Sequence, residues 1–255
     1  MLLAIDIGNS HIVLGAFEGG QLRFVSRMST VAGTTADEYA VLLNGIFHLH
    51  SVPRDGFDGA VISSVVPGMD TAWCDAVFKV CGALSVVLGP GVKTGLNIKI
   101  DNPAQLGGDL VAAAVAAVAM FPLPAIVIDL GTATKISVLD ETGSFLGCSI
   151  TAGVEISLQA MTKRTAQLPL IHLKAPDRVI GVNTVHSMKS GLITGTAAML
   201  DGMVERMEDE TGQKMATVVA TGGLAKPVIG CCMRNIQHCE YLVLEGLRII
   251  YDKNR

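Results

Sequence analysis

The sequence predicts an α/β protein made of two related halves, because one strand–turn–strand pattern occurs in it twice. In each copy an apolar strand ends in Asp-x-Gly and a small polar pair, and a second apolar run follows. The first copy has its acid at Asp6 and the second at Asp129, which are 123 positions apart in a chain of 255 residues. Because this spacing is close to half the chain, we expect an N-terminal lobe over residues 1–119 and a C-terminal lobe over residues 120–255.

The residue types in both turns suit the binding of phosphate and of a cation. A carboxylate at the tip of a strand can hold a cation, and a glycine such as Gly8 or Gly131 lets a phosphate approach the backbone closely. Hydroxyl residues such as Thr132 offer side-chain donors. A single Asp-x-Gly is usually an ordinary turn, whereas two copies at this spacing favour a phosphate site. No Walker-type loop competes, because Val92 stands where a second glycine would precede Lys93.

Composition narrows the class of protein. Half of the residues are hydrophobic and 16% are charged, which is typical of a compact chain, and the net charge of −4 argues against nucleic-acid binding. Residues 110–128 are uncharged, but Pro122 and Pro124 divide them into a helix and a strand, so we expect no membrane span. The early acid at Asp6 argues against a signal peptide. Six cysteines without metal-ligand spacing indicate reduced thiols in a cytoplasmic protein.

Hydrophobic periodicity predicts alternating strands and helices in both lobes. Thr35 and Glu38 form a candidate capping box for the first helix. In the first lobe we expect strands over 2–7, 11–17, 59–66 and 84–88, and helices over 35–50, around Trp73 and over 110–121. In the second lobe we expect a hairpin over 126–139, a strand to Ile150, a helix from Val154, a loop-rich segment over 165–184, a helix over 185–209, a strand over 217–221 and a final helix near 241–248.

Two further segments have both a structural and a functional interpretation. Asp109 follows Gly107 and Gly108 at the start of an Ala-rich helix, where it is either an N-cap or a catalytic base with room for substrate beside it. The strand over 217–221 runs into Gly222-Gly223, which is either a plain strand–helix turn or the place where an adenosine rests against the backbone. The residues alone do not separate these alternatives.

The chain resembles the type III pantothenate kinases, members of the actin-like, sugar-kinase and heat-shock-chaperone ATPase superfamily. The resemblance runs nearly end to end and implies two duplicated actin-like (ribonuclease H-like) lobes with mixed sheets flanked by helices. It is carried in order by Asp6-Ile7-Gly8-Asn9-Ser10, Ser63-Ser64-Val65-Val66-Pro67, Gly89-Pro90-Gly91-Val92-Lys93-Thr94-Gly95-Leu96, Asn102-Pro103, Asp129-Leu130-Gly131-Thr132-Ala133-Thr134, Leu168-Pro169, Asn183-Thr184, Ser190-Gly191 and Ala220-Thr221-Gly222-Gly223-Leu224-Ala225.

The resemblance implies phosphoryl transfer from ATP to the primary hydroxyl of pantothenate, the first step of coenzyme A biosynthesis. It implies Asp109 as the base, Asp6 as a ligand of Mg²⁺ through water, and Asp129 as the support of a monovalent cation, K⁺ or NH₄⁺. It also implies a homodimer in which Thr184 reaches substrate across the interface. The implied ATP-binding residues are Asp6, Gly8, Asn9, Ser10, Gly131, Thr132, Gly222 and Gly223, and those for pantothenate are Gly107, Gly108, Asp109, Leu110 and Thr184.

Several substrate-side residues depart from the family pattern. Leu110 stands where an arginine is usual, so we expect weak pantothenate binding, with KM raised more than kcat is lowered. Lys135 stands where a threonine is usual. The chain also departs from the family pattern at Ile100, Cys148 and Ala152. Two hypotheses follow: a working pantothenate kinase with a rearranged pocket, or a catalytically impaired, nucleotide-binding paralogue that acts as a regulatory accessory protein.

Overall fold

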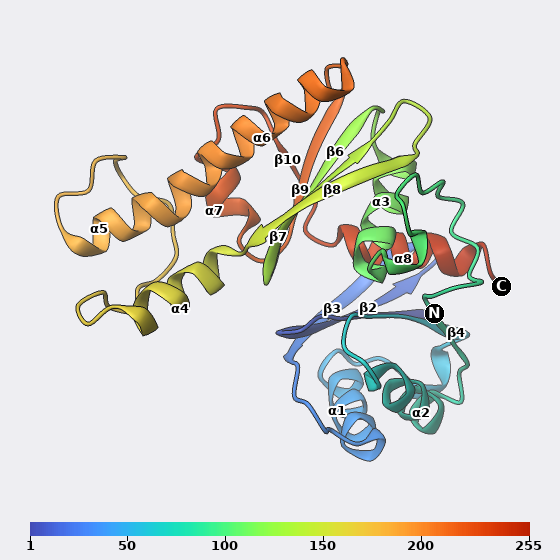
Figure 1. The fold of residues 1–255 in the computed structure, drawn as a ribbon. Helices are drawn as coiled ribbons and strands as arrows, with labels where there is room; N and C mark the ends of the chain where they lie inside the picture. Colours follow the sequence, from blue (N-terminus) through green and yellow to red (C-terminus); the bar gives the residue numbers. More distant parts are fainter. The chain divides into compact units, whose positions relative to one another are not determined.

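A computed structural model describes all residues 1–255, and their contacts divide the chain into two compact units (Figure 1). Unit 1 consists of Met1–Leu96, Asp101–Ala116 and Leu242–Arg255, and unit 2 of Asn97–Ile100 and Ala117–Tyr241. The main change of unit lies after Ala116, and the C-terminal segment from Leu242 belongs to the unit in which the chain begins.

Unit 1 is built on a mixed five-stranded sheet with the order β3-β2-β1-β4-β5. The central strand β1 pairs antiparallel with β2 and parallel with β4. The predicted strands are found close to their expected bounds, although the strand expected over 59–66 ends at Ser64. The strands are β1 (Leu2–Ile7), β2 (His11–Glu18), β3 (Gln21–Ser29), β4 (Gly59–Ser64) and β5 (Ser85–Val87).

Helices cover both faces of this sheet. The helices α1 (Ala36–Leu49) and α2 (Met69–Cys81) pack on one face and α8 (Leu242–Asp252) on the other, as Figure 1 shows. On the first face Tyr39 and Trp73 are fully buried and stack with ring centroids 4.4 Å apart. Thr35 and Glu38 form the predicted capping box of α1.

A backbone contact between two helices explains the Ala-rich segment. Helix α3 (Gly108–Met120) buries a run of alanines, and a Cβ added to Gly246 of α8 would collide with the carbonyl oxygen of Ala112. Only small residues allow such an approach. After α3 the chain enters β6 at Ala125, and none of the helices is long and apolar enough to cross a membrane.

Unit 2 repeats the topology of unit 1. Its five-stranded sheet has the order β10-β9-β6-β7-β8, and its central strand β6 pairs antiparallel with β7 and parallel with β9, as β1 does with β2 and β4. The predicted duplication and the mixed sheets are therefore confirmed. The strands are β6 (Ala125–Leu130), β7 (Ala133–Leu139), β8 (Phe145–Ala152), β9 (Thr217–Thr221) and β10 (Gln237–His238).

The helices of unit 2 follow the predicted order with one irregularity. The long helix expected over 185–209 is formed by α5 (Thr184–Lys189), a π-helical segment (Ser190–Thr194) and α6 (Gly195–Thr211). Residues 165–183 contain neither helix nor strand, as predicted. The remaining helices of unit 2 are α4 (Val154–Arg164) and α7 (Ala225–Ile229). Unit 1 contains two 3₁₀ turns, Arg54–Gly56 and Pro103–Gln105.

A buried carboxylate ties the end of α6 to the segments that follow it. Glu208 is 3% exposed and accepts hydrogen bonds from Arg234 Nη1 and Nη2 (2.9 and 3.0 Å), Lys214 Nζ (2.9 Å) and the backbone N–H of Met215 (3.0 Å). Desolvation by itself would raise the pKa of Glu208, but the hydrogen bonds from Lys214, Arg234 and Met215 lower it to about 2. The folded state therefore keeps this carboxylate charged.

Replacing Glu208 by glutamine is expected to lower the free energy of unfolding by about 2–4 kcal/mol at pH 7, because Arg234 loses its counter-charge. The difference from wild type should shrink as the pH falls from 4.5 towards about 2. Between these two pH values the carboxyl of Glu208 is protonated in the unfolded state and still ionised in the folded state. Urea unfolding measured across pH checks this, with Glu205→Gln, an exposed acid on the same helix, as the control. Equal losses for both variants would contradict the expectation.

Candidate active site

In unit 1 the first Asp-x-Gly turn follows the tip of the central strand. Asp6 pairs in parallel register with Ser63 of β4. The turn after it is fixed by Thr30, whose hydroxyl donates to the Gly8 carbonyl (2.7 Å) and whose N–H donates to the Ser10 carbonyl (3.0 Å). Asn9 and Ser10 are exposed at this turn. Their backbone and side-chain groups are thus presented to solvent on a rigid support.

Asp109 lies at the same end of the unit 1 sheet as Asp6. A Cβ added to Gly108 would come within 2.8 Å of the Oγ of Ser63, the strand neighbour of Asp6. A Cβ on Gly107 would lie 2.7 Å from the Oδ1 of Asp109. The two glycines therefore make room for these side chains.

The position of Asp109 within α3 bears on its two interpretations. The helix begins at Gly108, so Asp109 lies inside the first turn and not at the preceding capping position. Its Oδ1 accepts a hydrogen bond from the N–H of Leu110 (2.8 Å). Asp109 is therefore a residue of the first turn of α3 and not its N-cap.

In unit 2 the second Asp-x-Gly turn carries an ion pair. Asp129 of β6 lies directly opposite Lys135 of β7, and Lys135 Nζ is 2.9 Å from Asp129 Oδ2. The two side chains are only 19% and 18% exposed. A Cβ on Gly131 would lie 3.3 Å from Asp129 Oδ1, so the carboxylate lies close to the turn backbone.

Three turns of unit 2 meet at this point. The N–H of Gly153, after β8, donates to the carbonyl of Thr132 (3.1 Å), and an added Cβ on Gly153 would collide with the carbonyl oxygens of Gly131 and Thr132. Gly222, after β9, has φ +101°, and its added Cβ would lie 2.6 Å from the Leu130 carbonyl. The structure thus brings together the turns that contain Gly131, Thr132, Gly222 and Gly223, the unit 2 residues that the family resemblance implies for ATP binding.

The sequence pattern did not predict that Gly153 contacts the turn at Gly131 and Thr132. The sequence feature that could have indicated this contact is the position of Gly153 directly after β8, the strand that pairs with β7. The remaining predicted residues lie on helices. Leu110 is half-buried in α3, and Thr184 is exposed at the start of α5, where Asn183 caps the helix by accepting from the N–H of His186 (2.9 Å).

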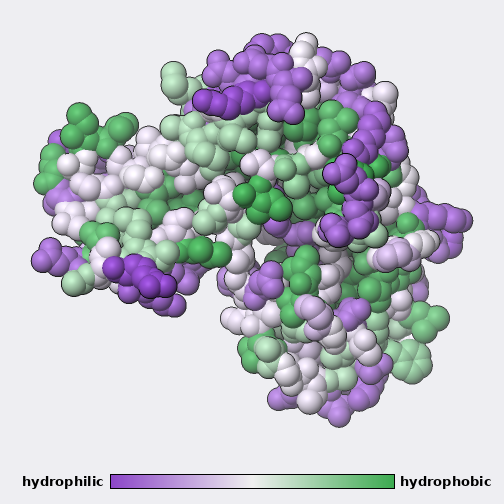
Figure 2. Space-filling model, viewed as in Figure 1, coloured by the Kyte–Doolittle hydropathy of each residue, from purple (hydrophilic) through white to green (hydrophobic).

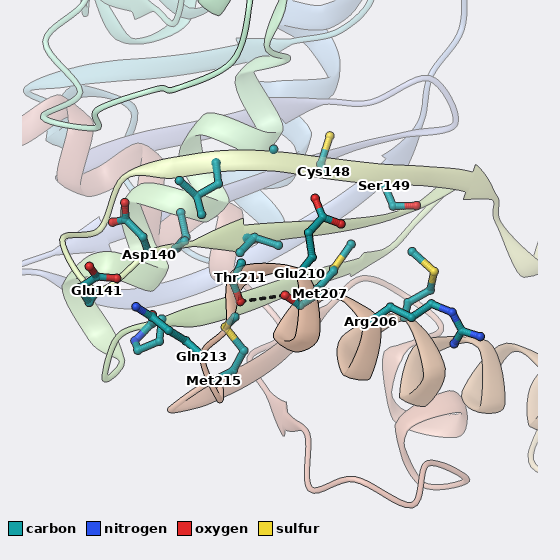
Figure 3. Close-up of a pocket in the computed structure, with 16 residues that line it drawn as sticks. Asp140, Glu141, Cys148, Ser149, Arg206, Met207, Glu210, Thr211, Gln213 and Met215 are labelled. Atoms are coloured by element: carbon teal, nitrogen blue, oxygen red, sulfur yellow. Dashed lines mark hydrogen bonds between the residues drawn. The ribbon is translucent and has the colours of Figure 1, made fainter.

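A cavity of about 800 Å³ in unit 2 is not part of this constellation. It lies between β8 and the C-terminal end of α6, where Thr211, Gln213 and Met215 face the strand from below (Figure 3). Its lining mixes methionine side chains with charged groups such as Arg206 and Glu210. It contains Cys148, one of the departures from the family pattern, but none of the predicted site residues.

The fold places the chain in a class of proteins. Component A of the (R)-2-hydroxyglutaryl-CoA dehydratase of Acidaminococcus fermentans superposes with a TM-score of 0.61 at 14% identity, covering 100% of this chain and 99% of that one. The activator of the 2-hydroxyisocaproyl-CoA dehydratase of Clostridium difficile, solved with ADPNP, gives 0.60 at 13% identity, with 99% and 95% covered. Together with the two matching sheets, these likenesses show an actin-like fold of two duplicated lobes.

Sequence comparison defines the family within that class. The type III pantothenate kinase family profile matches residues 2–206. Relatives named type III pantothenate kinase are 41% identical over 256 residues in an Exiguobacterium species, covering 100% of both chains, and 43% identical over 261 residues in Streptomyces avermitilis, covering 100% of this chain and 98% of the relative. The chain therefore belongs to the type III pantothenate kinase family, and the resemblance is confirmed.

The contact between Gly153 and the Thr132 turn can be tested by adding a methyl group. Gly153→Ala is expected to push the turn away and to lower the free energy of unfolding by about 1–3 kcal/mol, as overpacking does elsewhere. Gly195→Ala is the matched control, because Gly195 is exposed on α6 and an added Cβ there meets no atom within 4 Å. Thermal and urea unfolding of both variants check the expectation, which is wrong if Gly153→Ala is as stable as the control.

Proposed function

We propose that the protein transfers the γ-phosphoryl group of ATP to the primary hydroxyl of pantothenate and so forms 4'-phosphopantothenate, the first step of coenzyme A biosynthesis. The single observation that carries the proposal is full-length identity of 40–43% to relatives named type III pantothenate kinase. The carboxylates Asp6 and Asp109 at one end of the unit 1 sheet, and the three converging turns of unit 2, support it. Because these relatives are named as kinases, the accessory-protein alternative has no support.

Asp109 is the proposed general base. Phosphoryl transfer requires little covalent help from the protein, so positioning and charge are the main contributions of its residues. The carboxylate of Asp109 lies in the first turn of α3, where its Oδ1 accepts a hydrogen bond from the N–H of Leu110. In this role it orients the pantothenate hydroxyl and accepts its proton as the new bond to phosphorus forms.

The two Asp-x-Gly turns and the turn after β9 are the proposed ATP-binding elements. Exposed amide and hydroxyl groups at the turn after Asp6, and the tightly packed glycine turns of unit 2, are suited to contact phosphates and the nucleoside. The residues in this role are Asp6, Gly8, Asn9, Ser10, Gly131, Thr132, Gly222 and Gly223.

The residues of unit 1 fit Mg²⁺, whereas those of unit 2 do not fit K⁺ or NH₄⁺. Asp6 offers a carboxylate at a strand tip, and Mg²⁺ typically takes one or two carboxylates together with water and substrate phosphates. When bound, it would neutralise charge on the transferring group. The carboxylate of Asp129, by contrast, already holds the ammonium of Lys135 at 2.9 Å, and a second cation there would meet that charge.

Pantothenate is proposed to contact Gly107, Gly108, Asp109 and Leu110, and also Thr184 of a second copy in a homodimer. The expectation of weak binding at Leu110 stays a prediction. Support for the dimer comes from exposed apolar side chains before α5, including Leu170 (76% exposed) and Ile180 (80% exposed). Hydrophobic atoms gather over this edge of unit 2 in Figure 2. A monomer rarely leaves such a group of side chains in water.

Asp109→Asn is expected to lower kcat by roughly 10²- to 10⁴-fold, the usual contribution of a positioned base. The affinity for ATP should change little, because Asp109 is not among the proposed nucleotide residues. A coupled assay of ADP release with and without pantothenate measures both effects. Asp101→Asn, an exposed acid in the loop before α3, serves as the control. Turnover equal to that of wild type would show that Asp109 has only a structural role.

Ile180→Asp is expected to convert the dimer into a monomer and to raise the KM for pantothenate, because Thr184 of the second copy then no longer contacts the substrate. Sedimentation equilibrium gives the mass, and initial rates give the KM. Val41→Asp is the control, since Val41 is similarly exposed (73%) but lies on α1 of unit 1. A wild-type protein that sediments as a monomer would contradict the dimer.

A further inference from the structure

The ion pair of Asp129 and Lys135 differs from the other lysine pairs of unit 2 in its burial. Lys135 is 18% exposed, whereas the lysines of the pairs Lys99–Asp140 and Lys226–Glu240 are 48% and 70% exposed. Taking an ammonium out of water is costly, and an isolated buried pair is weak support for stability. A partly buried lysine at the proposed nucleotide turn therefore calls for a functional explanation.

The sheet itself fixes the position of the ammonium. Asp129 and Lys135 are directly paired residues on the antiparallel strands β6 and β7, two positions before Gly131 and three positions after Thr132. Side chains opposite each other on such strands lie close together without any loop rearrangement. The positive charge is thus held next to the turn that is proposed to contact phosphate.

The duplicated copy in unit 1 has no such charge. The residue opposite Asp6 in the β1–β2 pair is Val13, while the residue opposite Asp129 in the β6–β7 pair is Lys135. The two related turns therefore differ in charge at one matched position. The strand neighbour of Asp6 in β2 is thus uncharged, whereas the strand neighbour of Asp129 in β7 is a lysine that pairs with it.

We propose that Lys135 is a resident cation of the nucleotide site, which replaces a bound monovalent cation at Asp129 and makes ATP binding independent of K⁺ and NH₄⁺. The inference rests on the proposed function, in that the turn at Gly131 and Thr132 is taken to contact the phosphates of ATP. An uncompensated carboxylate next to those phosphates would repel them, and the ammonium of Lys135 removes that repulsion. A covalently attached charge is present at every salt concentration.

The test measures the affinity for a non-hydrolysable ATP analogue with Mg²⁺ by calorimetry, in K⁺, NH₄⁺ or tetramethylammonium at equal ionic strength. Wild type should bind equally well in all three. Lys135→Met, which keeps the length of the side chain but not its charge, should bind about 10- to 100-fold more weakly in tetramethylammonium. It should recover part of this loss in K⁺ or NH₄⁺, because the Asp129 carboxylate is then open to a cation.

Two further variants keep the test independent of folding. Lys99→Met is the matched control, because it breaks a lysine–aspartate pair of the same unit away from the turn, and it should behave as wild type. The double variant Lys135→Met with Asp129→Asn removes both charges, so its affinity should not respond to K⁺. Melting temperatures without nucleotide report the same site, since K⁺ should raise that of Lys135→Met alone.

The outcomes separate this inference from the proposed function. A wild type that phosphorylates pantothenate but binds the analogue more tightly in K⁺ overturns the role of Lys135 and leaves the function standing. Lys135→Met with wild-type affinity in tetramethylammonium also overturns it. Cation-independent analogue binding that requires Lys135, without turnover of pantothenate, supports the inference and overturns the function. A wild type that does not bind the analogue overturns both.

Discussion

The backbone register of strand β6 is the constraint on which the candidate site of unit 2 depends. β6 pairs with β7 on one side and with β9 on the other, so Lys135, Asp129 and Thr221 lie in one row across three strands. A slip of one residue would turn this row to the opposite face of the sheet. The turns at Thr132 and Gly222 then follow from where those strands end. Phosphoryl transfer depends on positioning, and a register held by backbone hydrogen bonds provides it.

The parts of the fold that the sequence predicted are those determined by local pattern. Alternating apolar residues defined the central strands, Thr35 and Glu38 defined a helix start, and the repeated Asp-x-Gly defined the duplication. The hairpin that contains Asp129 also follows from local pattern, because a three-residue connection, residues 131–133, places residue 135 opposite residue 129. The ion pair could therefore have been derived from the hairpin alone, and the site was most predictable where it is built from one hairpin.

Contacts between distant segments could not be derived in the same way. The approach of Gly153 to the carbonyl of Thr132, and of Gly222 to Leu130, depends on strand order in the sheet, which no local pattern contains. The two-residue strand β10 is too short to show a period. The space beside Gly107 and Gly108 was assigned to substrate, because the positions of Ser63 and the Asp109 carboxylate were unknown. Tertiary packing decides each of these features.

The return of the C-terminal helix to unit 1 sets the order in which the chain can reach its final state on the ribosome. The central strand β1 is synthesised before α8, yet α8 covers one face of its sheet. The same helix also contacts α3, through the close approach of Gly246 to Ala112. Unit 2 is continuous from Ala117 to Tyr241 apart from four residues at 97–100, so it is synthesised before α8. One face of the unit 1 sheet therefore stays without α8 until unit 2 has been made, and unit 1 completes its packing only after that point.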